Sequence, residues 1–156
     1  KNKNKIFSIG NGGSCAISDH LCCDFTKGTH FESFPDLNTY SLGSNNSLTS
    51  AIANDIGYEF VFSNQIKSFG AKDDILIAIS SSGNSKNIIN AIDIAKEIGM
   101  KVIGFCGFSG GEMIKKVDFC LHTPAHNYGV VEDCHQSLMH IIAQVIRMRR
   151  SKLIDW

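Results

Sequence analysis

Net charge, long apolar runs and paired cysteine motifs are all missing from this sequence. Its 156 residues hold 15 basic and 15 acidic side chains, a balance that gives no reason to expect a nucleic-acid or membrane surface. We find no signal peptide and no apolar run long enough to span a membrane. The six cysteines show neither Cys-x-x-Cys spacing nor a zinc-finger pattern. These absences favour a reduced, cytoplasmic protein that binds neither nucleic acid nor membrane.

Repeats, low-complexity segments and linkers are absent too, so the length indicates one domain over residues 1–156. Short apolar runs alternate with helical patterns, which favours an α/β fold with a parallel sheet and helices on both faces. The sequence predicts five strands, at about 5–9, 38–43, 74–79, 101–106 and 118–122, and helices at about 14–26, 45–54, 58–68, 86–98, 111–116 and 129–149.

A glycine-rich segment follows the first predicted strand. Gly10-Asn11-Gly12-Gly13 leads into Ser14, a pattern typical of a strand, a tight turn and a helix N-terminus. Glycines let backbone N–H groups approach an anion, and the helix N-terminus adds partial positive charge. The segment lacks the P-loop lysine and the third glycine of a dinucleotide fingerprint. An ordinary strand-to-helix turn explains the segment as well as a phosphate site does.

A serine-rich loop follows the most apolar strand. Ser80, Ser81, Ser82 and Ser85 place four hydroxyls at the carboxyl end of that strand, just before a predicted helix. In open α/β sheets, ligands bind at the carboxyl ends of the strands. A solvated turn is the alternative, but the pairing with the glycine segment favours two loops that close on one phosphate.

Two helices carry residues suited to acid–base chemistry or to zinc. His20 and Asp24 lie one turn apart, and Glu132, Gln136 and His140 recur every four residues on another helix. Surface histidines and a helix-start carboxylate are the alternative interpretation. The spacing does not show that the two helices meet. Asp55 either projects a carboxylate toward the ligand or belongs to a helix-ending turn.

These motifs together resemble the sugar isomerase (SIS) domain family and, within it, the phosphoheptose isomerases. The resemblance rests on features in order along the chain: Gly10-Asn-Gly-Gly-Ser14 with His20, Asn54-Asp-Ile-Gly-Tyr58, Ile79-Ser-Ser-Ser-Gly-Asn-Ser85, Gly110-Gly111 and the terminal helix with His140. The resemblance implies a flavodoxin-like sheet of five parallel strands. It also implies conversion of sedoheptulose 7-phosphate to a mannoheptose 7-phosphate that supplies surface polysaccharide.

The resemblance further implies roles for individual residues. Asp24 would be the catalytic base and His140 the acid, and His20, Asp24, Glu132 and His140 would bind zinc. Asn11 and Asp55 would contact sugar hydroxyls. The remaining substrate and phosphate contacts would come from Gly12, Gly13, Ser14, Ser80, Ser81, Ser82, Ser85 and Glu132. The family forms homotetramers with the help of N-terminal helices that this sequence does not show, so we expect a homotetramer, or at least a homodimer.

Four positions depart from the family pattern. Asp24 stands in place of a Glu, Glu132 in place of a Gln, Gly129 in place of an Asp, and Gly28 in place of an Arg. Two alternatives therefore stay open. One is a SIS isomerase of another phosphosugar, and the other is a non-catalytic SIS protein that binds partners, like the replication-initiator-associating homologue.

Overall fold

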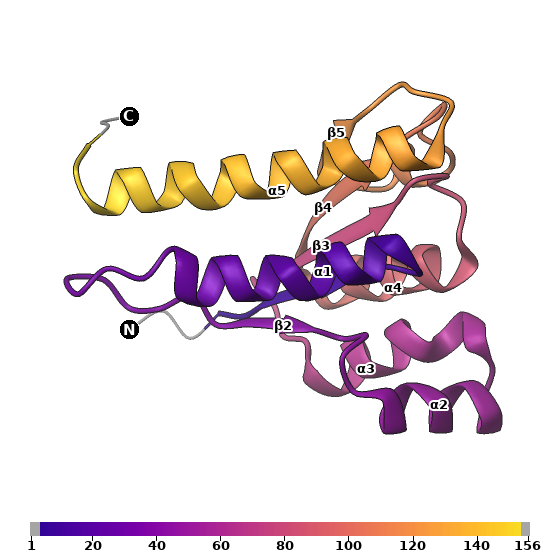
Figure 1. The fold of residues 1–156 in the computed structure, drawn as a ribbon. Coiled ribbons are helices and arrows are strands. Elements are labelled where there is room, and N and C mark those ends of the chain that lie inside the picture. Colours follow the sequence, from indigo (N-terminus) through magenta and orange to yellow (C-terminus); the bar gives the residue numbers. More distant parts are fainter. Residues whose placement is uncertain (1–3, 154–156) are drawn as a thin grey trace.

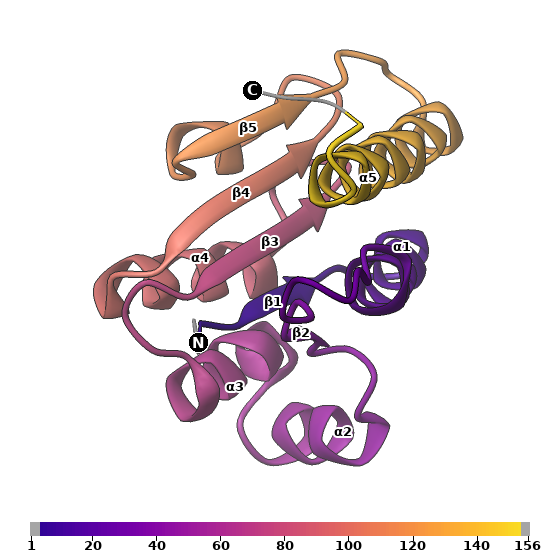
Figure 2. The same ribbon diagram turned by 90° about the vertical axis from the view of Figure 1, so that its left-hand side faces the viewer.

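A five-stranded, all-parallel sheet forms the centre of the molecule in the computed structural model, which describes residues 4–153. Its strands follow the order β2-β1-β3-β4-β5, shown in Figure 2. They span β1 Ile6–Ile9, β2 Thr39–Ser41, β3 Ile75–Ser80, β4 Lys101–Cys106 and β5 Phe119–His122. This is the flavodoxin-like order that the resemblance implies, so the predicted fold is confirmed.

Helices cover both faces of this sheet. Helices α1 (Gly13–Cys23) and α5 (Tyr128–Arg150) lie side by side on one face, as Figures 1 and 2 both show. The other face is covered by α3 (Val61–Phe69) and α4 (Lys86–Ile98), with α2 (Asn46–Asp55) packed on α3. None of the helices in residues 4–153 combines the length and apolar character needed to cross a membrane.

Strand β3 is the most buried part of the sheet because it contributes side chains to both apolar layers. Leu76 and Ala78 pack with α3 and α4, whereas Ile77 and Ile79 pack with α1 and α5. Side chains alternate between the two faces of a strand, so a strand covered on both faces must be apolar throughout. This explains why the uninterrupted apolar run identified the strand correctly from the sequence.

Several element boundaries differ from those predicted. Helix α4 and strand β4 match, but α1 ends at Cys23 and continues as one wide π-helical turn over Asp24–Gly28. The Thr29 N–H donates to the Asp24 carbonyl at 2.9 Å, the i→i+5 bond that defines this turn. The helix predicted at 58–68 begins with a 3₁₀ turn over Tyr58–Phe60, and the one predicted at 111–116 is only a 3₁₀ turn over Met113–Lys115.

His135 belongs to the apolar layer beneath α5. Its ring is fully buried and meets the Phe105 ring edge-on, with 5.7 Å between the two centroids. Burial lowers the pKa of His135, because the charged ring would lose its hydration, and the backbone of Cys106 offsets part of that shift. Burial therefore favours the neutral ring in the folded protein.

We expect this histidine to make the free energy of unfolding depend on pH. Its pKa is lower in the folded than in the unfolded chain, so stability is full above the unfolded pKa of about 6.5 and falls as the pH drops through that value. Urea unfolding at pH 7.5 and at pH 5.5 measures this loss. His135→Leu should reduce the difference between the two pH values, and His126→Asn, which replaces an exposed ring, should leave it unchanged.

Candidate active site

The glycine segment links β1 to α1 and approaches α5 closely. Gly13 opens α1, and a Cβ added there would lie 2.4 Å from the Glu132 carboxylate. A side chain at position 13 would therefore displace the Glu132 carboxylate from the N-terminus of α1. Gly12 caps the helix with a φ of 54°, and the Ser14 side chain in the first turn is buried.

The serine loop joins β3 to α4 and is held by the loop that follows β4. Gly83 has a φ of 66°, and a Cβ there would lie 2.1 Å from the Gly110 carbonyl oxygen. The Glu112 N–H donates to the Asn84 side chain at 2.9 Å. Within the loop, the Gly83 N–H donates to the Ser80 hydroxyl at 3.2 Å, and the Ser81 hydroxyl is buried without a hydrogen-bond partner. These contacts fix the backbone and leave a hydroxyl with unused hydrogen-bonding capacity.

Both loops line one cavity of about 160 Å³. The cavity is bounded by Asn11, Ser14, Ile79, Ser80, Ser81, Ser82, Ser85, Tyr128 and Glu132. Helices α1, α4 and α5 all begin beside it, and their N-termini favour an anion. The predicted convergence of the glycine and serine loops is therefore present in the structure.

Asn11 is fixed in this cavity by two partners that the sequence analysis did not single out as site residues. Its side-chain amide forms a reciprocal pair with Asn87, at 2.9 Å and 2.8 Å, and its oxygen also accepts from the Tyr58 hydroxyl at 2.9 Å. Asp55 does not line the cavity, and its carboxylate accepts a hydrogen bond from Asn54 at 2.8 Å. Its predicted contact with sugar hydroxyls stays a prediction.

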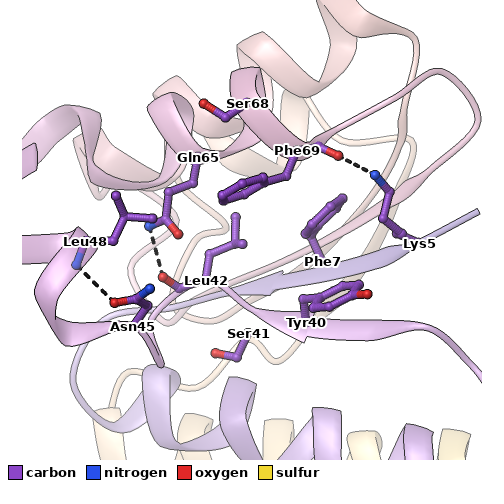
Figure 3. Close-up of a pocket in the computed structure, with 10 residues that line it drawn as sticks. All are labelled: Lys5, Phe7, Tyr40, Ser41, Leu42, Asn45, Leu48, Gln65, Ser68 and Phe69. Carbon is purple, nitrogen blue, oxygen red and sulfur yellow. Dashed lines mark hydrogen bonds between the residues drawn. The ribbon is translucent and has the colours of Figure 1, made fainter.

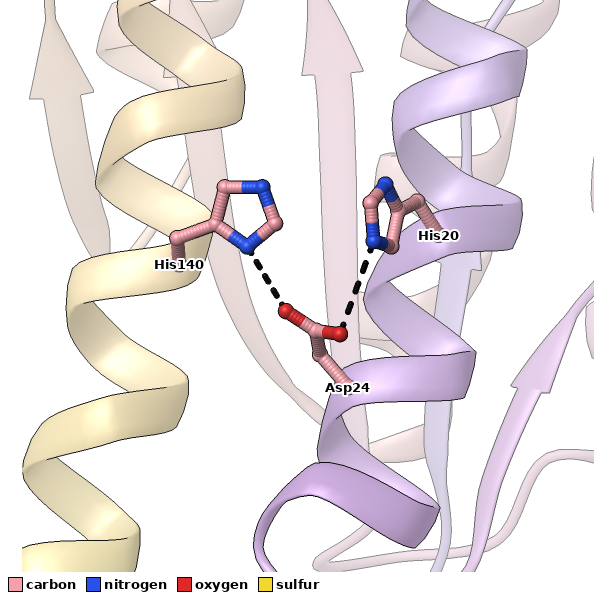
Figure 4. Close-up of side chains that lie close together, drawn as sticks. All are labelled: His20, Asp24 and His140. Atoms are coloured by element: carbon pink, nitrogen blue, oxygen red, sulfur yellow. Dashed lines mark hydrogen bonds and ion pairs between the residues drawn. The ribbon is translucent and has the colours of Figure 1, made fainter.

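Three of the four predicted metal ligands meet farther along α1 and α5. His140 Nδ1 lies 2.7 Å from Asp24 Oδ2, and His20 Nε2 lies 3.5 Å from Asp24 Oδ1 (Figure 4). One candidate ligand atom from each residue lies within 4.8 Å of the others. Nitrogen and oxygen donors at this spacing suit zinc. Glu132 is not part of this group, because its carboxylate lies against Gly13 in the serine-lined cavity.

The end of α5 holds the turn that carries Asp24. Arg147 donates to the Gly28 carbonyl at 3.1 Å, and Arg150 donates to the carbonyls of Thr29 and Pro35 at 3.0 Å each.

Gln136 lies one turn before His140, and its amide nitrogen contacts both imidazole rings, at 3.1 Å for His20 and 2.9 Å for His140. In the sequence, this contact is indicated only by the spacing of four residues between Gln136 and His140, which places both on one face of the helix.

A larger cavity of about 500 Å³ lies beside the edge strand β2, between this strand and α3 (Figure 3). Its lining is mostly apolar, including Phe7, Leu42 and Phe69. The one charged side chain there, Lys5, donates to the Phe69 carbonyl and pairs with Asp74. The one charged side chain of this mostly apolar cavity is therefore already paired, and the cavity suits an anion less well than the serine-lined one.

Fold and site together define a sugar isomerase (SIS) domain, and comparison with known families agrees. Residues 1–107 match the SIS domain model. The phosphoheptose isomerase of Aneurinibacillus thermoaerophilus is 38% identical over 146 residues, which cover 94% of this chain and 73% of the relative. The phosphoheptose isomerase of Helicobacter pylori strain P12 is also 38% identical, over 94% of this chain and 76% of the relative.

Solved structures give the same result. The phosphoheptose isomerase of Neisseria gonorrhoeae superposes with a TM-score of 0.86 at 34% identity, covering 93% of this chain and 77% of that one. The enzyme from Francisella tularensis superposes with a TM-score of 0.87 at 31% identity, with the same coverage. The chain therefore belongs to the SIS domain family and, within it, to the phosphoheptose isomerases. This confirms the resemblance found in the sequence.

We expect Glu132 to weaken the binding of phosphate in the serine-lined cavity, because its carboxylate repels a second anion there. Glu132→Gln should lower the dissociation constant for inorganic phosphate roughly tenfold, measured by calorimetry at low salt. Asp133→Asn is the matched control, since it removes the same charge from the next, exposed residue. Equal constants for Glu132→Gln and the unaltered protein would contradict this assignment.

Proposed function

We propose that this chain isomerises sedoheptulose 7-phosphate to D-glycero-D-manno-heptose 7-phosphate and so supplies heptose for surface polysaccharide. The proposal is supported by the family membership and by one observation above all, a carboxylate–imidazole pair 2.7 Å apart where α1 and α5 pack together, farther along these helices from a cavity suited to phosphate. Residues 1–156 would form a single SIS domain that acts on a phosphosugar.

The cavity would bind the phosphate group of the substrate. Hydroxyls of Ser14, Ser80, Ser81, Ser82 and Ser85 would donate to the phosphate oxygens, together with backbone N–H groups at Gly12 and Gly13. Asn11, held by Asn87, would orient a sugar hydroxyl. Binding energy from the phosphate would thereby position the other end of the sugar for reaction.

Asp24 and His140 would move the protons. In the open-chain ketose, the Asp24 carboxylate would take a proton from C1 while His140 gives O2 the Nδ1 proton that it otherwise donates to Asp24, which produces an enediol. Asp24 would then return a proton to C2 while His140 takes the proton of O1, which produces the aldose. The direct contact between Asp24 and His140 keeps the two proton-transfer groups next to one another.

The group formed by His20, Asp24 and His140 would also hold a zinc ion, because its donors match those of zinc sites. Glu132 was expected as a fourth ligand, and its place in zinc binding stays a prediction. When bound, zinc would act as a Lewis acid toward the substrate oxygens.

The central experiment is a coupled assay with sedoheptulose 7-phosphate, run with and without added zinc. Asp24→Asn and His140→Gln should each lower kcat at least ~100-fold, because each removes one proton-transfer group. Ser137→Ala, an exposed position on the same helix, should retain full activity. Full turnover by Asp24→Asn would contradict the role given to this carboxylate.

We further propose a cytoplasmic homotetramer. The six cysteines are free thiols, which fits a reducing compartment. Apolar side chains lie exposed on β5 and α5, with Phe119 67% and Ile141 57% accessible to solvent. Such surfaces commonly mark contacts between subunits.

Light scattering after size-exclusion chromatography should give a mass of about four times the 17.1 kDa of one chain. Ile141→Lys should lower this mass, since it buries a charge in the proposed contact. Ser50→Lys, on the exposed surface of α2, is the control and should not change it. A monomer at micromolar concentration would contradict the proposal.

A further inference from the structure

The amide of Gln136 connects the two imidazole rings of the site. Its nitrogen lies 3.1 Å from His20 Nδ1 and 2.9 Å from His140 Nε2. His140 lies one turn farther along α5 and His20 lies on α1, so this one amide spans the space between two helices. The rings themselves meet edge-on, with centroids 4.9 Å apart.

Asp24 contacts the same two rings from their other nitrogens. Its carboxylate lies 2.7 Å from His140 Nδ1 and 3.5 Å from His20 Nε2. Gln136, His20, Asp24 and His140 therefore form a closed ring of contacts in which every imidazole nitrogen has a partner. Figure 4 shows the half of this ring that surrounds Asp24.

The chemistry of the two partners determines where the ring protons lie. An amide nitrogen only donates hydrogen bonds, and an ionised carboxylate only accepts them. Each imidazole thus accepts from Gln136, and His140 donates its remaining N–H to Asp24, whereas the remaining nitrogen of His20 lies 3.5 Å from the same carboxylate. This places the proton of His140 on Nδ1 and the proton of His20 on Nε2, and it directs two N–H groups at the Asp24 carboxylate.

We propose that Gln136 is a positioning residue, which bridges His20 and His140 and selects the tautomer and orientation in which both rings face Asp24. Its effect on the reaction rests on the isomerase function proposed above, whereas its effect on the rings does not. Gln136 does not line the serine-lined cavity, so it would act on proton transfer and not on phosphate binding.

The two rings depend on Gln136 to different degrees. His140 has a short contact with Asp24 that by itself favours the proton on Nδ1. His20 has a contact of 3.5 Å, too long for a strong hydrogen bond, so its orientation and tautomer depend mainly on Gln136. Loss of the amide should therefore affect the His20 ring first.

Gln136 also faces the side of each ring that a metal bound near Asp24 would leave free. Histidine ligands usually donate their second N–H to an outer partner, which orients the ring and strengthens the ligand. An amide can serve as that partner by presenting its oxygen, and a carboxylate serves better. The affinity of the site for zinc should therefore increase with the ability of residue 136 to accept hydrogen bonds from the two imidazoles.

Two near-isosteric variants test the proposal. Gln136→Met keeps the length of the side chain but removes both hydrogen bonds, and Gln136→Glu keeps only acceptors. Nitrogen-15 spectra of the imidazoles in the metal-free protein should show a single tautomer for His20 in the unaltered chain and a mixture in Gln136→Met. Zinc affinity, measured by competition with a chelating dye, should be roughly tenfold weaker in Gln136→Met and roughly tenfold tighter in Gln136→Glu.

Ser137→Glu adds the same charge as Gln136→Glu at the next, exposed position and should change zinc affinity less than twofold. In the isomerase assay, Gln136→Met should lower kcat at least ~10-fold with little change in KM. Equal melting temperatures for Gln136→Met and the unaltered protein would show that the fold is intact.

A single His20 tautomer and unchanged zinc affinity in Gln136→Met would overturn the proposal. If zinc binds none of the proteins measurably, the imidazole spectra alone decide. If the spectra change as expected but the unaltered protein does not turn over sedoheptulose 7-phosphate, the proposed function fails and the role of Gln136 in positioning the rings stands.

Discussion

The packing of α1 against α5 on one face of the sheet is the contact on which the site depends. At one end, Gly13 lets the first turn of α1 approach Glu132. In the middle, the apolar side chains of both helices share the layer beneath them, and His20 and Asp24 face His140. At the far end, the arginines of α5 hold the turn that follows Asp24. A shift of one helix along the other would break all of these contacts together.

The parallel sheet supplies the second half of the site, because it brings the loops after β1 and β3 to the same edge. Three helix N-termini and a set of serine hydroxyls favour the binding of an anion there, whereas the carboxylate of Glu132 disfavours it. The carboxylate that the family pattern would assign to the metal therefore lies in the anion cavity in this chain. Gln136, one turn farther on, contacts the histidines instead.

Much of this arrangement follows from local sequence patterns. The apolar run of β3 and the glycine after α4 identify those elements, and the i,i+4 spacing of His20 and Asp24 places them on one helical face. The meeting of Asp24 with His140 could not be predicted from spacing, because 116 residues separate them and tertiary packing alone brings them together. The wide turn at Asp24 and the Asn11–Asn87 pair likewise depend on long-range contacts. No short pattern in the sequence marks them.

Incubation of the protein with sedoheptulose 7-phosphate in D₂O, with the product analysed by NMR, tests the central claim most directly. Asp24 is 24% exposed, so a proton that it takes from the sugar can exchange with solvent before it is returned. We predict aldose product that carries deuterium at C2 from the unaltered protein, and no product from Asp24→Asn. Product with deuterium at C2, formed at an unchanged rate by Asp24→Asn, would contradict proton transfer through this carboxylate.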